Sequence, residues 1–267
     1  MALSYFPNGI LTPNIVGGGL EKPVVGNVYF VGATAGVNWV AGVDDPSCGS
    51  ITNPFATIDY AIGKCTAANY DTIYVMPGHT ETISGATSLV CDVAGVTIIG
   101  LGYGNARPTL SFSATGSYIP ISAANVTIKN IILKPGVDEV VKLFYITAAG
   151  VTLDTIDYQS VSTYSTLQFV LTTNAADQLT IQNCYHYQLT AGGSAQKWIQ
   201  LVGTDSTRIW NNRFNIVAAY ANVASICISG STAVVDVDIR GNDIVWGGAT
   251  ITKIIEMVTT STGIIAH

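Results

Sequence analysis

The chain has 267 residues, of which 48% are hydrophobic and only 10% are charged, with 11 Lys and Arg against 17 Asp and Glu. Sequence-independent binding of nucleic acid needs a basic stripe that displaces counterions from the phosphates, and a net charge of −6 argues against one. The composition also excludes a disordered chain, because disorder requires few apolar residues and much charge. Frequent Thr, Val, Ile, Gly and Asn instead predict many short strands joined by tight turns.

Residues 1–27 are expected to form an extended N-terminal arm that has no repeat of its own. Pro7, Pro13 and three successive glycines interrupt any helix, and only Glu21 and Lys22 carry side-chain charge. The arm is nevertheless too apolar for a solvated tail. We expect it to become ordered on a partner surface, and the alternative is that it wraps the base of its own oligomer. The contacts would be made by its apolar side chains, namely Leu3, Tyr5, Phe6, Ile10, Leu11, Ile15 and Val16.

No targeting or membrane segment is expected. The start of the chain lacks a basic stretch followed by an apolar run, so no secretory signal peptide is predicted. Residues 24–43 carry no charge over 20 positions, which is the length of a membrane span. Four glycines and two asparagines interrupt this stretch, so it predicts a strand and not a transmembrane helix.

One helix is predicted, just upstream of the repeats. Asn53-Pro54 supplies its start, and the apolar residues that follow are spaced for one face, which predicts an amphipathic helix over about residues 54–67. An open stack of strands exposes its edges and its core, so we expect this helix to cap the N-terminal end. The strand at 72–76 is then predicted to open the stack.

A short apolar motif recurs downstream, at 96–98, 126–128, 151–153, 179–181, 207–209 and 237–239. Successive copies start 30, 25, 28, 28 and 30 residues apart. Five of the six copies carry Gly or Asn four residues after the start, which tolerate the left-handed backbone of a sharp corner, and Thr155 is the exception. Asn130, Asn183 and Asn211 are expected to form a corner ladder with hydrogen bonds from coil to coil.

A repeat of this length, with two or three short strands and no helical pattern, is typical of a parallel β-helix coil. One coil cannot bury its inward face alone, so neighbouring coils stack about 4.8 Å apart and share one apolar core. The predicted fold is therefore an all-β parallel β-helix of about six to eight coils. It forms a single domain over 28–267, with the coils running from about residue 72.

Two stretches carry a resemblance to a known family: Asn53 to Ile62 (NPFATIDYAI) and Asp71 to Glu81 (DTIYVMPGHTE). They resemble the opening segment of right-handed parallel β-helix proteins of the pectate-lyase-like superfamily, although Thr80 stands where that pattern usually has Tyr. Residues 94–109 are similar to a version found among tailed-phage virion proteins. The resemblance implies a right-handed parallel β-helix, in a superfamily that includes lyases, hydrolases, tailspikes and structural virion parts.

The resemblance also implies what a catalytic site would require. Lyases of this fold use an Asp cluster that holds calcium beside a basic residue, and glycosidases use two or three carboxylates in a groove. Aligning the repeats places Asp154 and Asp157 on either side of one corner, with Arg213 two coils further on, as the best catalytic candidates. No third carboxylate accompanies them in the alignment. We favour the alternative that they form surface ion pairs, Lys129–Asp154 and Arg213–Asp243.

No cofactor or metal site is expected. The five cysteines show no CxxC spacing and are predicted to be free thiols, and the three histidines share no column of the aligned repeats. Several aromatic side chains are predicted to pack in the core or between subunits, with a sugar-stacking strip as the alternative: Tyr185, Tyr187, Trp198, Trp210 and Trp246.

Sparse outward carboxylates, a charge-poor surface suited to burial between subunits and the resemblance to phage β-helices favour a structural virion protein. We expect a homotrimeric decoration (cement) protein or head spike without enzymatic activity. It would contact the major capsid protein of the phage head through the arm, at the capsid surface, after synthesis in the bacterial host cytoplasm. The alternative is a tailspike-like receptor-binding protein or a polysaccharide depolymerase with a host-surface glycan as partner. Neither a nucleic-acid nor a membrane partner is expected.

Overall fold

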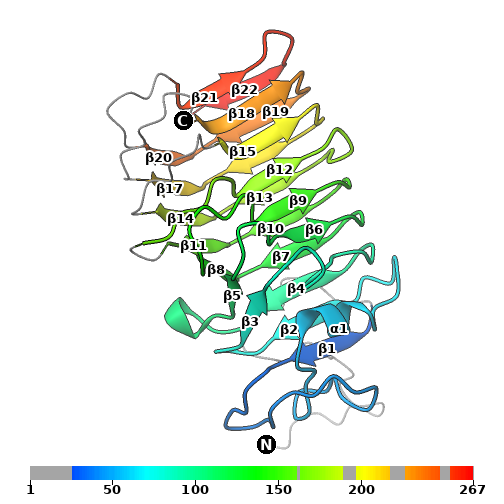
Figure 1. Ribbon diagram of the computed structural model, residues 1–267. Coiled ribbons are helices and arrows are strands. Elements are labelled where there is room, and N and C mark those ends of the chain that lie inside the picture. The colour runs from blue at the N-terminus through cyan, green and yellow to red at the C-terminus, as the bar shows by residue number, and fades with distance from the viewer. Residues whose placement is uncertain (1–25, 161–162, 189–196, 217–225, 247–252, 267) are drawn as a thin grey trace, which may run out of the picture.

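The computed structural model describes residues 26–160, 163–188, 197–216, 226–246 and 253–266. The chain winds as a parallel β-helix whose coils contribute strands to three sheets, here called A, B and C (Figure 1). Within each sheet the strands of successive coils are hydrogen-bonded neighbours and run parallel. The all-β parallel β-helix predicted from the repeats is thereby confirmed.

The three sheets differ in the number of coils that they span. Sheet A has nine strands: β1 (Val28–Val31), β2 (Thr72–Val75), β4 (Thr97–Gly100), β7 (Thr127–Lys129), β10 (Thr152–Asp154), β13 (Thr180–Gln182), β16 (Arg208–Trp210), β19 (Val237–Arg240) and β22 (Gly263–Ala266). Sheet B has seven: β3 (Thr80–Ile83), β5 (Thr109–Phe112), β8 (Ile132–Pro135), β11 (Asp157–Gln159), β14 (Tyr185–Gln188), β17 (Arg213–Ile216) and β20 (Asp243–Trp246). Sheet C has six: β6 (Ile119–Ile121), β9 (Phe144–Ile146), β12 (Val170–Thr172), β15 (Lys197–Val202), β18 (Ile226–Thr232) and β21 (Ile255–Met257).

The strand register in sheet A follows the sequence repeat. The last residue of each motif lies in the middle of its strand and faces its counterpart in the next coil, as Ile128 faces Leu153 and Leu153 faces Ile181. Each of these side chains is buried, because side chains alternate along a strand and the central position points inward. The flanking positions, such as Thr127 and Thr152, point outward and are only half-buried.

Sheet A begins one strand earlier than expected, so the prediction that the strand at 72–76 opens the stack was wrong. β1 pairs in parallel with β2, from Val28 against Thr72 to Val31 against Val75. The intervening chain returns to the same sheet edge, where Phe55 forms a bridge with Val31. The connection between β1 and β2 is long and has no repeat pattern, which is why the periodicity alone did not include β1 in the stack.

The corners between sheets A and B use the backbone conformation that the turn-formers were predicted to provide. Asn130, Thr155, Asn183 and Asn211 have φ of 60°, 55°, 55° and 54°. Gly100 was expected to occupy the equivalent corner, but it lies inside β4. A glycine is needed there for another reason: a Cβ atom would lie 2.1 Å from the Asn130 carbonyl oxygen of the next coil.

The predicted helix is present but much shorter than residues 54–67. α1 spans only Ile58–Ile62, begins after Thr57, whose side chain accepts a hydrogen bond from the Tyr60 N–H, and ends at Gly63. Residues 54 and 55 cannot join it, because the Phe55 N–H donates to the Phe30 carbonyl and extends the sheet edge instead. The buried face of α1 packs near β1 and β2. That it serves as the cap of the N-terminal end remains a prediction.

The core is a continuous apolar column that runs from β1 to β19. Cys91, Cys184 and Cys227 are buried in it, and all five cysteines have free thiols. Burial raises the pKa of the Cys91 and Cys184 thiols to about 12, which makes them unreactive at neutral pH. In the described part of the chain, no helix is long and apolar enough to cross a membrane.

His186 on β14 is the unusual member of this core. Its ring centroid lies 4.3 Å from that of Phe169, 4.8 Å from that of Phe214 and 5.6 Å from that of Trp198. Among the described residues neither ring nitrogen has a hydrogen-bond partner. Burial therefore lowers the pKa of His186 to about 3, and the imidazole is neutral in the folded protein.

We predict that this histidine makes the fold acid-sensitive. In the unfolded chain the imidazole takes up a proton near its ordinary pKa of 6.5, whereas in the folded protein it does so only near 3. The unfolded state thus binds more protons between these values, and stability should fall by about 2 kcal/mol between about pH 7.5 and pH 5. Urea unfolding at the two pH values measures this difference. The His186→Phe variant should lose most of it, and an undiminished pH dependence in that variant would contradict the assignment.

Candidate functional site

The candidate carboxylates lie at the corner where β10 passes into β11. Asp154 ends β10, Thr155 takes the left-handed conformation, Ile156 turns into the core, and Asp157 begins β11. Asp154 is 8% exposed and Asp157 is 6% exposed. The corner therefore holds two carboxylates at the surface of the helix, each largely enclosed by neighbouring coils.

Asp154 is held by donors from both adjacent coils. Its Oδ1 accepts from Asn183 Nδ2 at 3.0 Å and from Thr155 Oγ1 at 2.9 Å, and its Oδ2 accepts from Gln182 Nε2 at 3.3 Å. Lys129 Nζ, one coil earlier, lies 3.7 Å from Oδ2. Burial raises the pKa of Asp154, but these hydrogen bonds and the Lys129 charge outweigh it and hold the pKa below its usual value. The carboxylate is therefore ionised at neutral pH and a weak base.

Asp157 is bound by a cation that the repeat alignment did not suggest. Its Oδ2 contacts Arg107 Nη2 and accepts from Gln159 Nε2 at 2.8 Å. Its Oδ1 is buried and has no hydrogen-bond partner within the described ranges. Arg107 follows the single-turn 3-10 helix η1 (Gly104–Ala106), just before β5. In sheet B, β8 lies between β5 and β11, so the Arg107 side chain reaches past β8 to Asp157 on β11.

Arg107 was missed because it belongs to no column of the repeats. It lies in the long connection between β4 and β5, where the chain leaves the regular corner. The sequence did show an arginine near the end of residues 94–109, just before β5. The repeat could not predict its partner, because only residues in aligned columns have predictable neighbours. The Arg107–Asp157 pair fastens this connection to the side of the helix.

Arg213, the third candidate, is separate from the two carboxylates. It lies on β17, and β14 stands between it and Asp157 on β11. Its Nε is 3.3 Å from Asp243 Oδ2, and its guanidinium lies 5.7 Å from the Tyr185 ring centroid. Both ion pairs expected from the alignment, Lys129–Asp154 and Arg213–Asp243, are present.

Two of the three corner asparagines donate side-chain hydrogen bonds to groups of the preceding coil. Asn130 Nδ2 donates to the carbonyl oxygens of Gly100 at 2.7 Å and Gly102 at 3.0 Å, and Asn183 Nδ2 donates to Asp154. Asn211 shares the left-handed backbone of the other two corner asparagines. These bonds still connect one coil to the preceding one.

Two further asparagines, Asn212 and Asn242, form a ladder inside the β-helix that was not predicted from the sequence. Asn212 Oδ1 accepts from the Cys184 N–H at 2.9 Å, and Asn242 Oδ1 accepts from the Asn212 N–H at 2.9 Å. Asn212 Nδ2 donates to the Ile181 carbonyl at 2.9 Å, and Asn242 Nδ2 donates to the Ile209 carbonyl at 2.7 Å. Each residue directly follows a left-handed corner, and that placement was the signal that could have identified them.

The polar residues of the resemblance motif fasten the first coils together. Glu81 Oε2 accepts from the Ile58 N–H at 3.1 Å and lies 3.1 Å from His79 Nε2, while His79 Nδ1 accepts from the Ala33 N–H at 3.0 Å. The buried Asp71 carboxylate likewise accepts from backbone N–H groups of Asn27 and Thr66. In the described residues no group of three or more His, Cys, Asp or Glu side chains could hold a metal ion.

The aromatic candidates divide between core and surface. Trp198 is fully buried, whereas Tyr185 and Tyr187 project from β14 with ring centroids 6.4 Å apart and planes 8° from parallel. Trp210 is half-buried, with the Arg208 guanidinium 5.6 Å from its ring. The side chain of Trp246 and the arm residues Leu3, Tyr5, Phe6, Ile10, Leu11, Ile15 and Val16 lie outside the described residues.

We predict that Arg107 stabilises the folded chain more than Arg213 does. The side chains of Arg107 and Asp157 are only 13% and 9% exposed, so Arg107→Met leaves a buried carboxylate without its cation and should cost about 3 kcal/mol. The matched control Arg213→Met breaks a pair that is 60% and 63% exposed and should cost less than about 1 kcal/mol. Denaturant unfolding gives both values, and equal losses would argue against the Arg107 contact.

Comparison with known proteins adds one result to this geometry. No protein-family model matches the chain, and no curated protein matches it. A solved structure titled rhamnogalacturonan lyase is similar, with a TM-score of 0.57 and 14% identity over 87% of this chain. The match covers 62% of the lyase chain, so this chain spans less than two thirds of its length. At this identity the likeness concerns the fold alone: the chain is a parallel β-helix protein, with a fold related to that of a polysaccharide lyase.

Proposed function

We propose that this chain is a non-catalytic structural subunit of a tailed-phage virion, a homotrimeric capsid decoration protein or head spike. The observation that carries the non-catalytic part is that the candidate carboxylates are enclosed by their own neighbours, and that Asp157 Oδ1, their one oxygen without a hydrogen-bond partner among the described residues, is buried. Asp154 has three hydrogen-bond donors and a lysine around it, and Asp157 is bound by Arg107 and Gln159.

Sugar-cleaving chemistry on this fold demands a different arrangement. A general acid or base must reach the scissile bond with a free oxygen, and glycosidases place two such carboxyl groups across an open groove. Here the two carboxylates occupy one corner and point into contacts with their own neighbours. An ionised carboxylate with fixed donors is suited to holding coils together and poorly suited to moving protons.

The virion assignment is supported by the resemblance of residues 94–109 to a segment found among tailed-phage virion proteins. Low charge in a chain of this size also favours contact with other subunits. The partners would be two further copies of the chain and the major capsid protein, at the capsid surface.

A second candidate function is binding or cleavage of a host-surface polysaccharide. The observation that favours it is the pair of near-parallel rings of Tyr185 and Tyr187 on the outer face of sheet B, beside Arg213 and Asn215. Aromatic faces and nearby amide or guanidinium donors are groups that can orient a sugar ring. The fold relation to a polysaccharide lyase is compatible with this function.

Quantitative mass spectrometry of purified phage particles separates the two candidates. A decoration protein should be present at hundreds of copies per particle, in proportion to the major capsid protein. A receptor-binding protein should be present at a few copies. Absence from particles would exclude both virion roles.

The absence of catalysis is a second expectation. Asp154→Asn and Asp157→Asn should leave particle assembly and host range unchanged at temperatures at which the variants stay folded, because neither side chain acts on a glycan. Asp157→Asn should lower the free energy of unfolding, because it removes the charge that pairs with Arg107. The purified protein should not release oligosaccharides from host capsule or lipopolysaccharide. Release that disappears in these two variants would favour the depolymerase, whereas loss of glycan binding in Tyr185→Ala would favour the receptor-binding function.

The arm is predicted to anchor the protein to the capsid. Deletion of residues 2–19 should leave a trimer with a nearly unchanged melting temperature, because the described core begins only at β1. The truncated trimer should no longer bind capsids in a sedimentation assay. Normal capsid binding, or failure to form the trimer in light scattering, would show that the arm has another role.

A further inference from the structure

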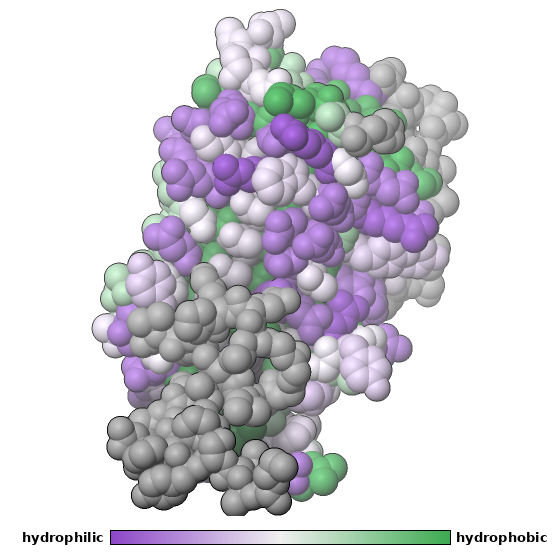
Figure 2. All heavy atoms as spheres, turned by 180° about the vertical axis from the view of Figure 1, so that it is seen from behind, coloured by the Kyte–Doolittle hydropathy of each residue, from purple (hydrophilic) through white to green (hydrophobic). Residues whose placement is uncertain are grey.

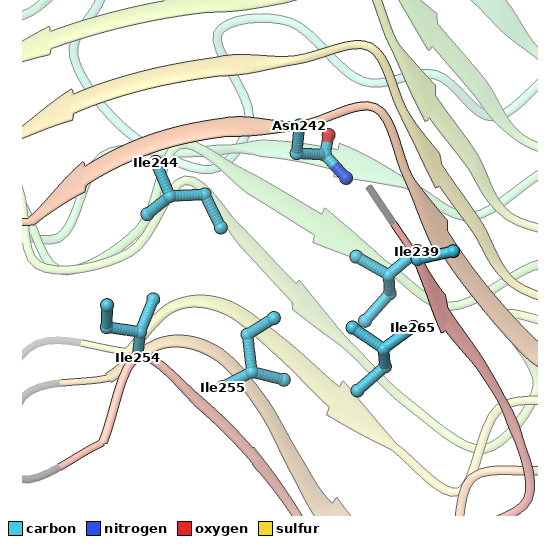
Figure 3. A pocket seen from close by; sticks show the side chains of 7 residues that line it. Ile239, Asn242, Ile244, Ile254, Ile255 and Ile265 are labelled. Carbon is cyan, nitrogen blue, oxygen red and sulfur yellow. The ribbon is translucent and has the colours of Figure 1, made fainter.

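The side of the β-helix that Figure 2 shows is mainly polar. Between the two ends of the described stack, hydrophilic and near-neutral side chains cover most of this view. Apolar side chains point inward instead, as far as the last described coil, where the labelled isoleucines converge on a hollow (Figure 3). The distribution of charge, more than apolar area, therefore decides which side can bind a partner.

The outward charges of sheets A and B are largely neutralised within the chain. Two ion pairs lie on each sheet, namely Lys129–Asp154 and Arg240–Asp238 on sheet A, and Arg107–Asp157 and Arg213–Asp243 on sheet B. Arg208 on β16 lies over the Trp210 ring, and Lys134 on β8 takes part in no ion pair of the described residues. These two faces therefore offer a partner few free charges.

Sheet C has an uncharged middle. The register of its strands places one outward column along the centre of the face, and from β6 to β18 this column contains Pro120, Tyr145, Leu171, Gln200 and Ser229. Glu256 on β21 continues the column and is paired with Lys253. A partner that approaches the centre of this face between β6 and β18 therefore buries no unpaired charge.

The edge at which the chain enters sheet C carries three lysines: Lys142 before β9, Lys197 at the start of β15 and Lys253 before β21. Neither Lys142 nor Lys197 takes part in an ion pair within the described ranges. Two carboxylates, Asp138 and Glu139, share this edge before β9, and Asp138 accepts from the Ser165 hydroxyl at 2.7 Å. From β12 onward, the described part of this edge has cations and no carboxylate. It is called the basic edge below.

The opposite edge, at which the chain leaves sheet C for sheet A, is acidic. Asp177, Asp205 and Asp236 occupy the corners of three successive coils, before β13, β16 and β19. The Asp205 N–H donates to Asp177 Oδ1 at 2.8 Å, and Ser206 Oγ lies 3.4 Å from Asp236 Oδ2. Asp92 lies at the same edge in an earlier coil, directly after the bridge to β6. No cation pairs with these four carboxylates among the described residues. It is called the acidic edge below.

We propose that the outer face of sheet C binds the same face of further copies of this chain about an axis parallel to the β-helix, with the basic edge of each copy against the acidic edge of the next. Copies related by such an axis run parallel, and each coil meets the coil at its own height. Lys197 then meets Asp205 of the partner subunit, and Lys142 lies one coil from the level of Asp177 of the partner subunit. An antiparallel contact would set basic edge against basic edge, which like-charge repulsion opposes. This inference rests on the homotrimer of the proposed function and assigns its interface.

Charge reversal on the purified full chain tests this interface. Lys197→Glu and Asp205→Lys should each require about a hundredfold more protein for assembly in light scattering, because like charges then face each other at every contact. The double variant should assemble as the wild type does. At 3.3 Å per residue, β15 holds the two positions about 20 Å apart within one chain, so only a contact between copies can restore assembly. The matched control Lys134→Glu changes an unpaired lysine of sheet B and should keep the wild-type mass.

A cysteine in the central column identifies the parallel arrangement. Leu171→Cys should give a disulfide between two copies on mild oxidation, because the centre of the face lies nearest to the axis, whereas Asn215→Cys on sheet B should not. A wild-type trimer whose mass neither reversal changes would overturn this interface and leave the trimer standing. A monomeric wild type would overturn both, and a double variant that stays dissociated would overturn the pairing of the edges. A wild-type dimer with the same response to reversal would confirm the interface and correct the number of copies.

Discussion

The structure depends on one constraint: every coil must return to the same three sheet positions one strand spacing further along the axis. Hydrogen bonds between parallel strands set that spacing at about 4.8 Å, so equivalent residues of successive coils stand in columns. An inward column must be apolar throughout, as the Ile128, Leu153 and Ile181 column is. The corners must turn within a few residues, which explains the left-handed residues at Asn130, Thr155 and Asn183.

The same columns determine the electrostatics of the surface. A charged residue that points outward lies beside the outward residues of the coils before and after it, so a cation and a carboxylate in one column form a pair. Lys129–Asp154 and Arg213–Asp243 arise in this way. Asp157 has Ile132 and Tyr185 as its column neighbours, and its cation comes from outside the repeats, through Arg107. The candidate carboxylates are therefore part of the fastening between coils.

A solenoid has no internal reason to stop, so its ends are where the fold leaves groups unpaired. Large exposed apolar residues are concentrated accordingly. One set lies in the connection after β1, at Val37, Val40, Val43 and Ile51, and another lies at the C-terminal end, at Val245, Ile254, Ile264 and Ile265. The low charge of the sequence led us to expect apolar sides for lateral trimer contacts. The described side chains instead place much of the exposed apolar surface at the two ends of the described stack.

The sequence by itself determined the fold class, the register of sheet A and the two column ion pairs, because each follows from a period that equals one coil. It did not reveal the pairing of β1 with β2, the shortness of α1 or the contact of Arg107 with Asp157, because these arise in connections that have no period. It also gave no sign that His186 is enclosed by aromatic rings, because Phe169, Trp198 and Phe214 are brought around it only by the winding of the chain. Whether a side chain is paired, enclosed or left at an open end depends on which coil lies next to it in space. Stacking decides that neighbour, and local sequence specifies it only where the repeat is regular.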